Sequence, residues 1–159
     1  MDNKARYITQ AAIIAAIYVV VTIVFQAISF REIQIRISEA LTILPYFTPA
    51  AIPGLFIGCL IANYLGGAML ADIILGSLAT LLAAILSYSL RKNRYLVPIP
   101  PIIINAIVVG FLLKYVYGFA LPLISLMILV AIGQFISCFI LGLGLIYAME
   151  KYKLYRHIT

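Results

Sequence analysis

Polar side chains interrupt the long apolar stretches of this sequence at a small number of positions. An unpaired polar group inside an apolar bundle is costly, so each such residue is a functional candidate by default. Carboxyl and amide groups that face a common cavity open to the outside would recognise a polar solute rich in hydrogen-bonding groups. We therefore interpret the following as candidate substrate-binding residues: Arg36, Glu39, Asn63, Asp72, Asn105 and Gln134.

These residues also have purely structural interpretations. Glu39 follows the candidate N-cap Ser38, and Asp72 is itself a candidate N-cap, so either carboxyl group can simply favour the positive end of a helix. Asn105 and Gln134 can instead hydrogen-bond across neighbouring helices and hold them together. The sequence alone leaves both interpretations open.

The sequence carries no recognisable catalytic or metal-binding motif. Walker A, HExxH and GxSxG patterns are absent, and the single histidine is His157, close to the end of the chain. Cys59 and Cys138 lie singly within apolar segments, which predicts two buried small residues and neither a disulfide framework nor a metal site. Glu39 and Asp72 could form an acid/base pair, but nothing else completes a catalytic site. We expect no catalytic residue, metal or cofactor in this chain.

The composition of the chain is typical of an integral membrane protein. Of the 159 residues, 65% are hydrophobic and 10% are charged, whereas a soluble domain needs about a quarter charged residues to cover its surface. At roughly 20 apolar residues per crossing, this length allows about six spans. The basic residues, which give a net charge of +6, lie in short clusters between apolar runs and do not indicate nucleic acid. We expect one all-α, polytopic domain in the cell membrane.

Charge and proline patterns predict six transmembrane helices with both termini in the cytoplasm. Basic clusters fall within residues 4–6, 91–94 and 151–156, and cytoplasmic loops collect Lys and Arg. All three clusters lie on one side of the membrane only if an even number of crossings separates each from the next. Three long apolar stretches separate the first cluster from the second, so the proline-containing run 40–71 must cross twice or re-enter. The expected helices cover about residues 8–30, 38–47, 49–66, 72–90, 98–117 and 121–149.

Residues 31–37 alternate between isoleucine and polar side chains, which is the period of an extended strand. On the outer face of the bundle this segment would fold over the helices as a lid. In the alternative interpretation, it is an interfacial segment whose isoleucines dip into the lipid headgroups.

Four alanines of the first helix form two overlapping pairs of small residues, Ala11 with Ala15 and Ala12 with Ala16. Residues four apart share a helical face, and small side chains let another helix approach closely. These alanines are candidate partner-docking residues near the cytoplasmic end. Packing within the bundle explains the same pattern equally well.

Several motifs carry a resemblance that extends over essentially the whole chain. They are Arg36–Leu41, Leu44–Pro45, Thr48–Leu55, Gly58, Ala62–Asn63, Asp72, Gly76–Leu81 and Pro100–Ala106. With them the chain resembles the QueT family of substrate-binding (S) components of energy-coupling factor (ECF) transporters. The resemblance implies a six-helix membrane protein that binds a vitamin-like solute near the outer surface, under the first extracellular loop.

The same resemblance implies partners and a cargo. Alanines of the first helix would dock on an ECF module, which consists of a transmembrane coupling subunit and two ATPase subunits that use ATP. The implied cargo is a queuosine precursor, a 7-deazaguanine such as queuine or one of its precursors. An aminomethylated precursor would be cationic, and Glu39 or Asp72 could balance its charge.

Two other functions remain open at this point. An autonomous secondary carrier or channel for a small polar solute would oligomerise through the alanine face and transport without ATP or partners. An intramembrane enzyme using Glu39 and Asp72 would return its solute chemically changed.

Overall fold

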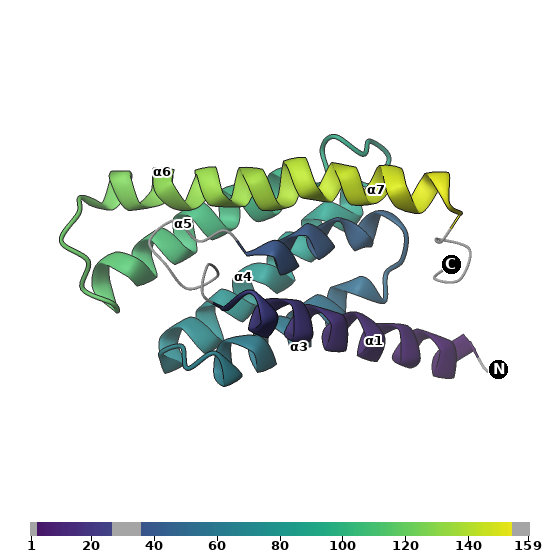
Figure 1. Ribbon diagram of the computed structural model, residues 1–159, viewed down its shortest axis with the longest axis horizontal. Helices are drawn as coiled ribbons and strands as arrows, with labels where there is room; N and C mark the ends of the chain where they lie inside the picture. Colours follow the sequence, from purple (N-terminus) through teal and green to yellow (C-terminus); the bar gives the residue numbers. More distant parts are fainter. Residues whose placement is uncertain (1–2, 27–35, 154–159) are drawn as a thin grey trace.

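The computed structural model of the chain describes residues 3–26 and 36–153. This part of the chain is helical and contains no strand, which confirms the all-α fold class. Figure 1 shows the helices packed side by side along one long axis. In chain order the elements are α1 (Asn3–Val24), η1 (Ile37–Tyr46), α3 (Ala51–Leu65), α4 (Leu70–Ser89), α5 (Ile99–Tyr115), α6 (Leu123–Gln134), η2 (Phe135–Leu141) and α7 (Gly142–Lys151).

The proline-containing run 40–71 forms two helices, as its length requires. The first, η1, is a 3₁₀ helix of 10 residues that contains Pro45, whose ring nitrogen has no N–H to donate. The chain then turns at Thr48, whose Oγ1 accepts the backbone N–H of Ala50 (3.3 Å) just before α3 begins. Pro45 and Thr48 therefore separate the two helices. A single unbroken helix over this run would be too long for one crossing of the membrane.

The final predicted helix, residues 121–149, is one continuous rod made of α6, η2 and α7 (Figure 1). Its middle part, η2, is a π-helix that covers seven residues. A π-helical stretch inserts extra backbone into a helix and is frequent at functional sites. Gln134 lies where α6 passes into this stretch.

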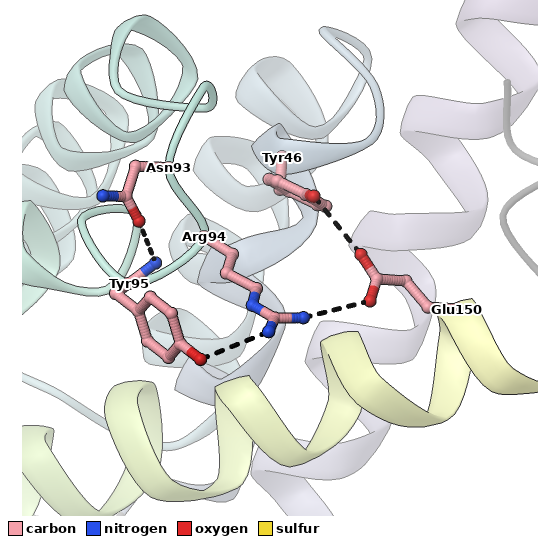
Figure 2. A network of polar contacts seen from close by, with 5 residues as sticks. All are labelled: Tyr46, Asn93, Arg94, Tyr95 and Glu150. Atoms are coloured by element: carbon pink, nitrogen blue, oxygen red, sulfur yellow. Dashed lines mark hydrogen bonds and ion pairs between the residues drawn. The ribbon is translucent and has the colours of Figure 1, made fainter.

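The described residues of the three basic clusters, which are 4–6, 91–94 and 151–153, lie at one end of the bundle. Figure 1 shows the N-terminal end of α1 and the C-terminal end of α7 at the same end. Figure 2 shows that the connection between α4 and α5 contacts α7 at this end: its Arg94 donates to Glu150 Oε2 (3.5 Å). Tyr46 Oη, at the end of η1, donates to Glu150 Oε1 (3.3 Å). We call this the basic end.

The opposite end is formed by two turns that contact each other. The backbone N–H of Met69, between α3 and α4, donates to Tyr117 Oη (3.3 Å), in the turn between α5 and α6. Gly67 and Gly118 have φ angles of +74° and +72°, a backbone conformation that favours glycine because it lacks a Cβ atom. Successive rods therefore alternate in direction, and both ends of the described chain lie at the basic end.

The polarity of the bundle is the inverse of that of a soluble protein. Three of the described helices are long and apolar enough to cross a membrane, namely α1, α4 and the rod 123–151, while α3 and α5 are shorter apolar helices. Large apolar side chains face outward, for example Ile13 (54% exposed), Leu82 (50%) and Ile124 (71%). Such a surface is compatible with lipid rather than water.

Helices α1 and α3 pack closely because small residues face each other. A Cβ atom added to Gly54 would lie 2.8 Å from the carbonyl oxygen of Ala11, and one added to Gly58 would lie 3.1 Å from Cα of Ala15. Ala11 and Ala15 are consequently buried inside the bundle. Of the four predicted docking alanines, Ala11 and Ala15 therefore face α3, whereas Ala12 and Ala16 are exposed.

Part of the prediction lies outside the described residues. This holds for residues 27–30 of the first expected helix and for residues 31–35 of the expected lid. At the end of that segment, Arg36 has an extended backbone (φ −91°, ψ 104°), and η1 follows directly.

Candidate solute-binding site

All six predicted polar residues are buried, each with at most 4% of its surface exposed. Buried polar groups are almost always hydrogen-bonded, so their partners define how the site is built. The residues come from the start of η1 and from α3, α4, α5 and α6. Each of these elements contributes one or two of the six side chains, and further buried Ser and Thr side chains lie among them.

Glu39 is the centre of the first group. Its Oε1 accepts a hydrogen bond from Tyr18 Oη (2.5 Å), and its Oε2 accepts one from Asn105 Nδ2 (3.3 Å). The three residues belong to η1, α1 and α5, so one carboxyl group ties together helices that are far apart in sequence. Both carboxyl oxygens of Glu39 are thereby occupied.

Arg36 and Asn63 form the second group. Arg36 Nη1 donates to Asn63 Oδ1 (3.1 Å), and Asn63 Nδ2 points to Cys59 Sγ (3.5 Å) one helical turn earlier. Thr80 Oγ1 of α4 also donates to Cys59 Sγ (3.4 Å). Sulfur is a weak acceptor, so these two contacts position the side chains more than they stabilise them. The guanidinium of Arg36 also interacts electrostatically with Glu39 and Asp72.

Asp72 lies in the first turn of α4. Its Oδ2 accepts a hydrogen bond from Tyr117 Oη (2.8 Å). Burial, together with this hydrogen bond, raises the pKa of Tyr117, in the turn beyond α5, to about 12. Tyr117 therefore remains a phenol and a hydrogen-bond donor to Asp72 at physiological pH.

Gln134 reaches the same interior indirectly. Its Oε1 accepts from Cys138 Sγ (3.1 Å), and Thr42 Oγ1 lies 3.5 Å from the same sulfur. Thr42 also donates to the backbone carbonyl of Glu39 (2.6 Å), which connects this chain of contacts to η1. The structure thus brings Arg36 to Asn63 and Glu39 to Asn105, whereas Gln134 joins through intermediaries.

Sequence reasoning missed several members of this polar interior. Tyr18 is fully buried, and Thr22 one turn later donates to Ser38 Oγ (2.7 Å) at the start of η1. The sequence did contain an indication of this role: Tyr18 and Thr22 carry polar groups four residues apart, on one face of an otherwise apolar helix. Tyr117 carried no comparable signal, because its role depends on contact between two turns. Cys59 and Cys138 are buried free thiols, as predicted.

The arrangement suits recognition better than reaction. The carboxyl, amide and hydroxyl groups bind one another across helix boundaries, and each oxygen of Glu39 already accepts one hydrogen bond from a neighbouring helix. Within residues 3–26 and 36–153 there is no group of three or more His, Cys, Asp or Glu side chains that could hold a metal ion. The site offers donors and acceptors at fixed positions.

An apolar exterior, helices long enough to cross a bilayer and a few polar side chains buried between them define a helical membrane protein. A family model described as QueT transporter matches residues 8–151, and the chain belongs to this family. A curated relative in Lactococcus lactis subsp. cremoris (strain MG1363), named queuosine precursor transporter QueT, is 40% identical over 81 residues. The match covers 50% of this chain and 47% of the relative, so the chain spans about half of that relative's length. No solved structure matches the chain.

Proposed function

We propose that this chain is the substrate-capture subunit of an ATP-driven ECF-type uptake transporter and that its solute is a queuosine precursor, a 7-deazaguanine. Membership of the QueT transporter family and the name of the Lactococcus relative support the solute class. The observation that carries the proposal is the convergence of Arg36, Glu39, Asn63, Asp72 and Asn105 inside an apolar bundle. Polar groups are retained at such depth where a solute uses them.

The chemistry of the polar interior fits a fused heterocycle. A 7-deazaguanine presents amide, amine and ring N–H groups along its edges, and carboxyl and amide side chains are their natural partners. Buried donors and acceptors discriminate strongly, because an analogue that lacks a matching group leaves them unsatisfied. Arg36, Asn63 and Asp72 supply a donor, an amide and a carboxyl group in adjacent elements.

The distribution of Lys and Arg supports one orientation of the bundle in the membrane. With the basic end in the cytoplasm, as Lys and Arg distribution favours, the turns around Gly67 and Gly118 face outward. Asp72 and Asn63 lie next to these turns, so the solute enters from outside. Both described chain ends are then cytoplasmic, and the ECF module supplies ATP hydrolysis, with no cofactor in this chain.

Titration calorimetry on the purified chain tests the proposed solute class. The chain contains no tryptophan, so the usual indole fluorescence signal is absent and heat is the more direct readout. We expect 7-deazaguanine to bind, and Asn105→Ala to weaken binding about tenfold or more, because Glu39 loses a buried donor. Ser89→Ala, at an exposed position of the basic end, is the control and keeps wild-type affinity. Absence of heat with the wild-type chain would rule out this solute class.

Reconstitution in liposomes separates the proposed mechanism from its alternatives. We expect uptake of the solute only when the ECF module and ATP are present. Uptake by the chain alone would instead support an autonomous carrier or channel. Solute recovered in chemically changed form would support an intramembrane enzyme.

A further inference from the structure

The basic end of the bundle carries a large excess of positive charge. Seven exposed Lys and Arg side chains of the described residues lie there, and Glu150 is the one described carboxyl group among them. Its ion pair with Arg94 (3.5 Å between Oε2 and Nη1) compensates one of the seven cations. The other six have no carboxyl partner in the described part of the chain: Lys4, Arg6, Arg91, Lys92, Lys151 and Lys153.

The same ion pair brings two of the basic segments together. Arg94 belongs to the connection between α4 and α5, and Glu150 belongs to the last turn of α7 (Figure 2). Their contact holds the connection that carries residues 91–92 against the end of the rod that carries residues 151–153. Like charges held close together repel one another, even where water and salt screen them in part. A bound anion would therefore stabilise this end of the bundle.

Arg91 is well placed to bind such an anion. Its guanidinium carbon lies 3.9 Å from the centre of the Tyr88 ring, over the face of that ring. A guanidinium held over an aromatic face keeps the N–H groups at its edge, and these match a phosphate with parallel hydrogen bonds. In the described part of the chain Arg91 has no ion pair, and its side chain is exposed. Lys92 is exposed beside it and adds a second charge.

Apolar side chains border these two cations. Leu90 and Leu96, on either side of them in the same connection, are each 39% exposed. Tyr95 (52% exposed) and Tyr147 (62%) lie at the same end, and tyrosine favours the boundary between hydrocarbon and headgroups. A partner that fits this surface carries an anionic phosphate next to an apolar body. A phospholipid has both, whereas nucleic acid and free phosphate lack the apolar part.

We propose that the basic end is a binding site for anionic phospholipids. Arg91, held over Tyr88, and Lys92 bind the phosphodiester, and Leu90 and Leu96 contact the acyl chains. With the orientation proposed above, the site faces the cytoplasmic leaflet, in which anionic lipids are concentrated. The site is distinct from the candidate solute-binding site and does not depend on the identity of the solute.

Native mass spectrometry of the purified chain tests this lipid preference. The chain is released from detergent micelles that contain equal amounts of phosphatidylglycerol, which is anionic, and phosphatidylcholine, which is zwitterionic, with the same acyl chains. We expect the wild-type chain to retain about tenfold or more phosphatidylglycerol than phosphatidylcholine, because each Lys or Arg near the surface adds to the attraction. Arg91→Gln with Lys92→Gln should lower this ratio about fivefold or more.

A single substitution at each end of the bundle provides a matched pair. Lys92→Gln should lower the ratio in part. Lys114→Gln makes the same change at the opposite end, where Nζ donates to the carbonyl oxygens of Phe119 (3.4 Å) and Leu121 (3.1 Å), and should keep the wild-type ratio. Lys151→Gln with Lys153→Gln reduces the charge on the neighbouring segment and should also lower the ratio, even if the Arg91 and Lys92 variant does not fold.

Three results would overturn the lipid site. The first is equal retention of the two lipids by the wild-type chain, or an unchanged ratio in both double variants. The second is a loss in the Lys114 variant as large as in the Lys92 variant, which would show that the net charge of the chain sets the ratio. The third is displacement of phosphatidylglycerol by an excess of inorganic phosphate, which would identify a phosphate site that does not require a lipid.

Discussion

Tyr18 on α1 donates its phenolic hydrogen to Glu39 on η1, with 2.5 Å between the two oxygens. Both residues are buried, at 0% and 1% exposure, and they are separated by 21 positions in the chain. The contact joins the first helix to the element that carries Arg36 and Glu39. It therefore connects the packing of the bundle to the geometry of the candidate site.

Replacing Tyr18 by Phe should destabilise the protein. The change leaves Glu39 Oε1 buried without its donor, which costs about 1–3 kcal/mol. The measurement is the Tm of the purified chain in detergent. Tyr64→Phe is the matched control, because Tyr64 is 70% exposed, and its Tm should stay at the wild-type value. An equal Tm for the two variants would show that the Tyr18 contact contributes nothing to stability.

Replacing Gly54 by Ala should also lower the Tm. The new methyl group would lie 2.8 Å from the carbonyl oxygen of Ala11, so α1 and α3 must move apart, at a cost of about 1–3 kcal/mol. Gly144→Ala is the control: among the described residues nothing lies within 4 Å of the added atom. There the better helix propensity of alanine should leave the Tm unchanged or raise it. Unaltered stability of the Gly54 variant would contradict the close packing of these helices.

The exposed alanines should determine docking on the ECF module, and the buried ones should determine folding. Ala12→Leu with Ala16→Leu places bulk on the outer face of α1, so co-purification with the module should be lost while solute binding persists. Ala11→Leu with Ala15→Leu instead forces α1 away from α3 and should lower the Tm. Intact co-purification of the Ala12 and Ala16 variant would remove docking from this face.

Cysteine labelling should place the two ends of the bundle on opposite sides of the membrane. The native Cys59 and Cys138 are buried and should stay silent toward an impermeant maleimide. Ala120→Cys, beside the turn at Gly118, should react in intact cells, and Lys92→Cys, at the basic end, should react only after the cells are opened. The reverse pattern would invert the topology and move the polar interior to the cytoplasmic half.

The sequence predicted six of the polar residues that lie in the interior. A charged or amide side chain within an apolar run is costly to expose to lipid, so it faces the interior of the bundle. Arg36 with Asn63 and Glu39 with Asn105 are such cases. It could not predict Tyr117, which reaches Asp72 through a contact between turns 45 positions apart. It also treated Ala11 and Ala15 as equivalent to Ala12 and Ala16, because spacing defines a helical face but not what lies opposite it.

Composition and charge pattern by themselves determined that this chain is helical, apolar on its surface and arranged with its basic clusters at one end. These properties follow from transfer free energies, which depend on residue type and local spacing. Only the tertiary structure decided which carboxyl oxygen is left open, because hydrogen-bond partners come from helices distant in sequence. Among the described residues, both oxygens of Glu39 accept hydrogen bonds and only one oxygen of Asp72 does, and that difference arises from how the helices pack.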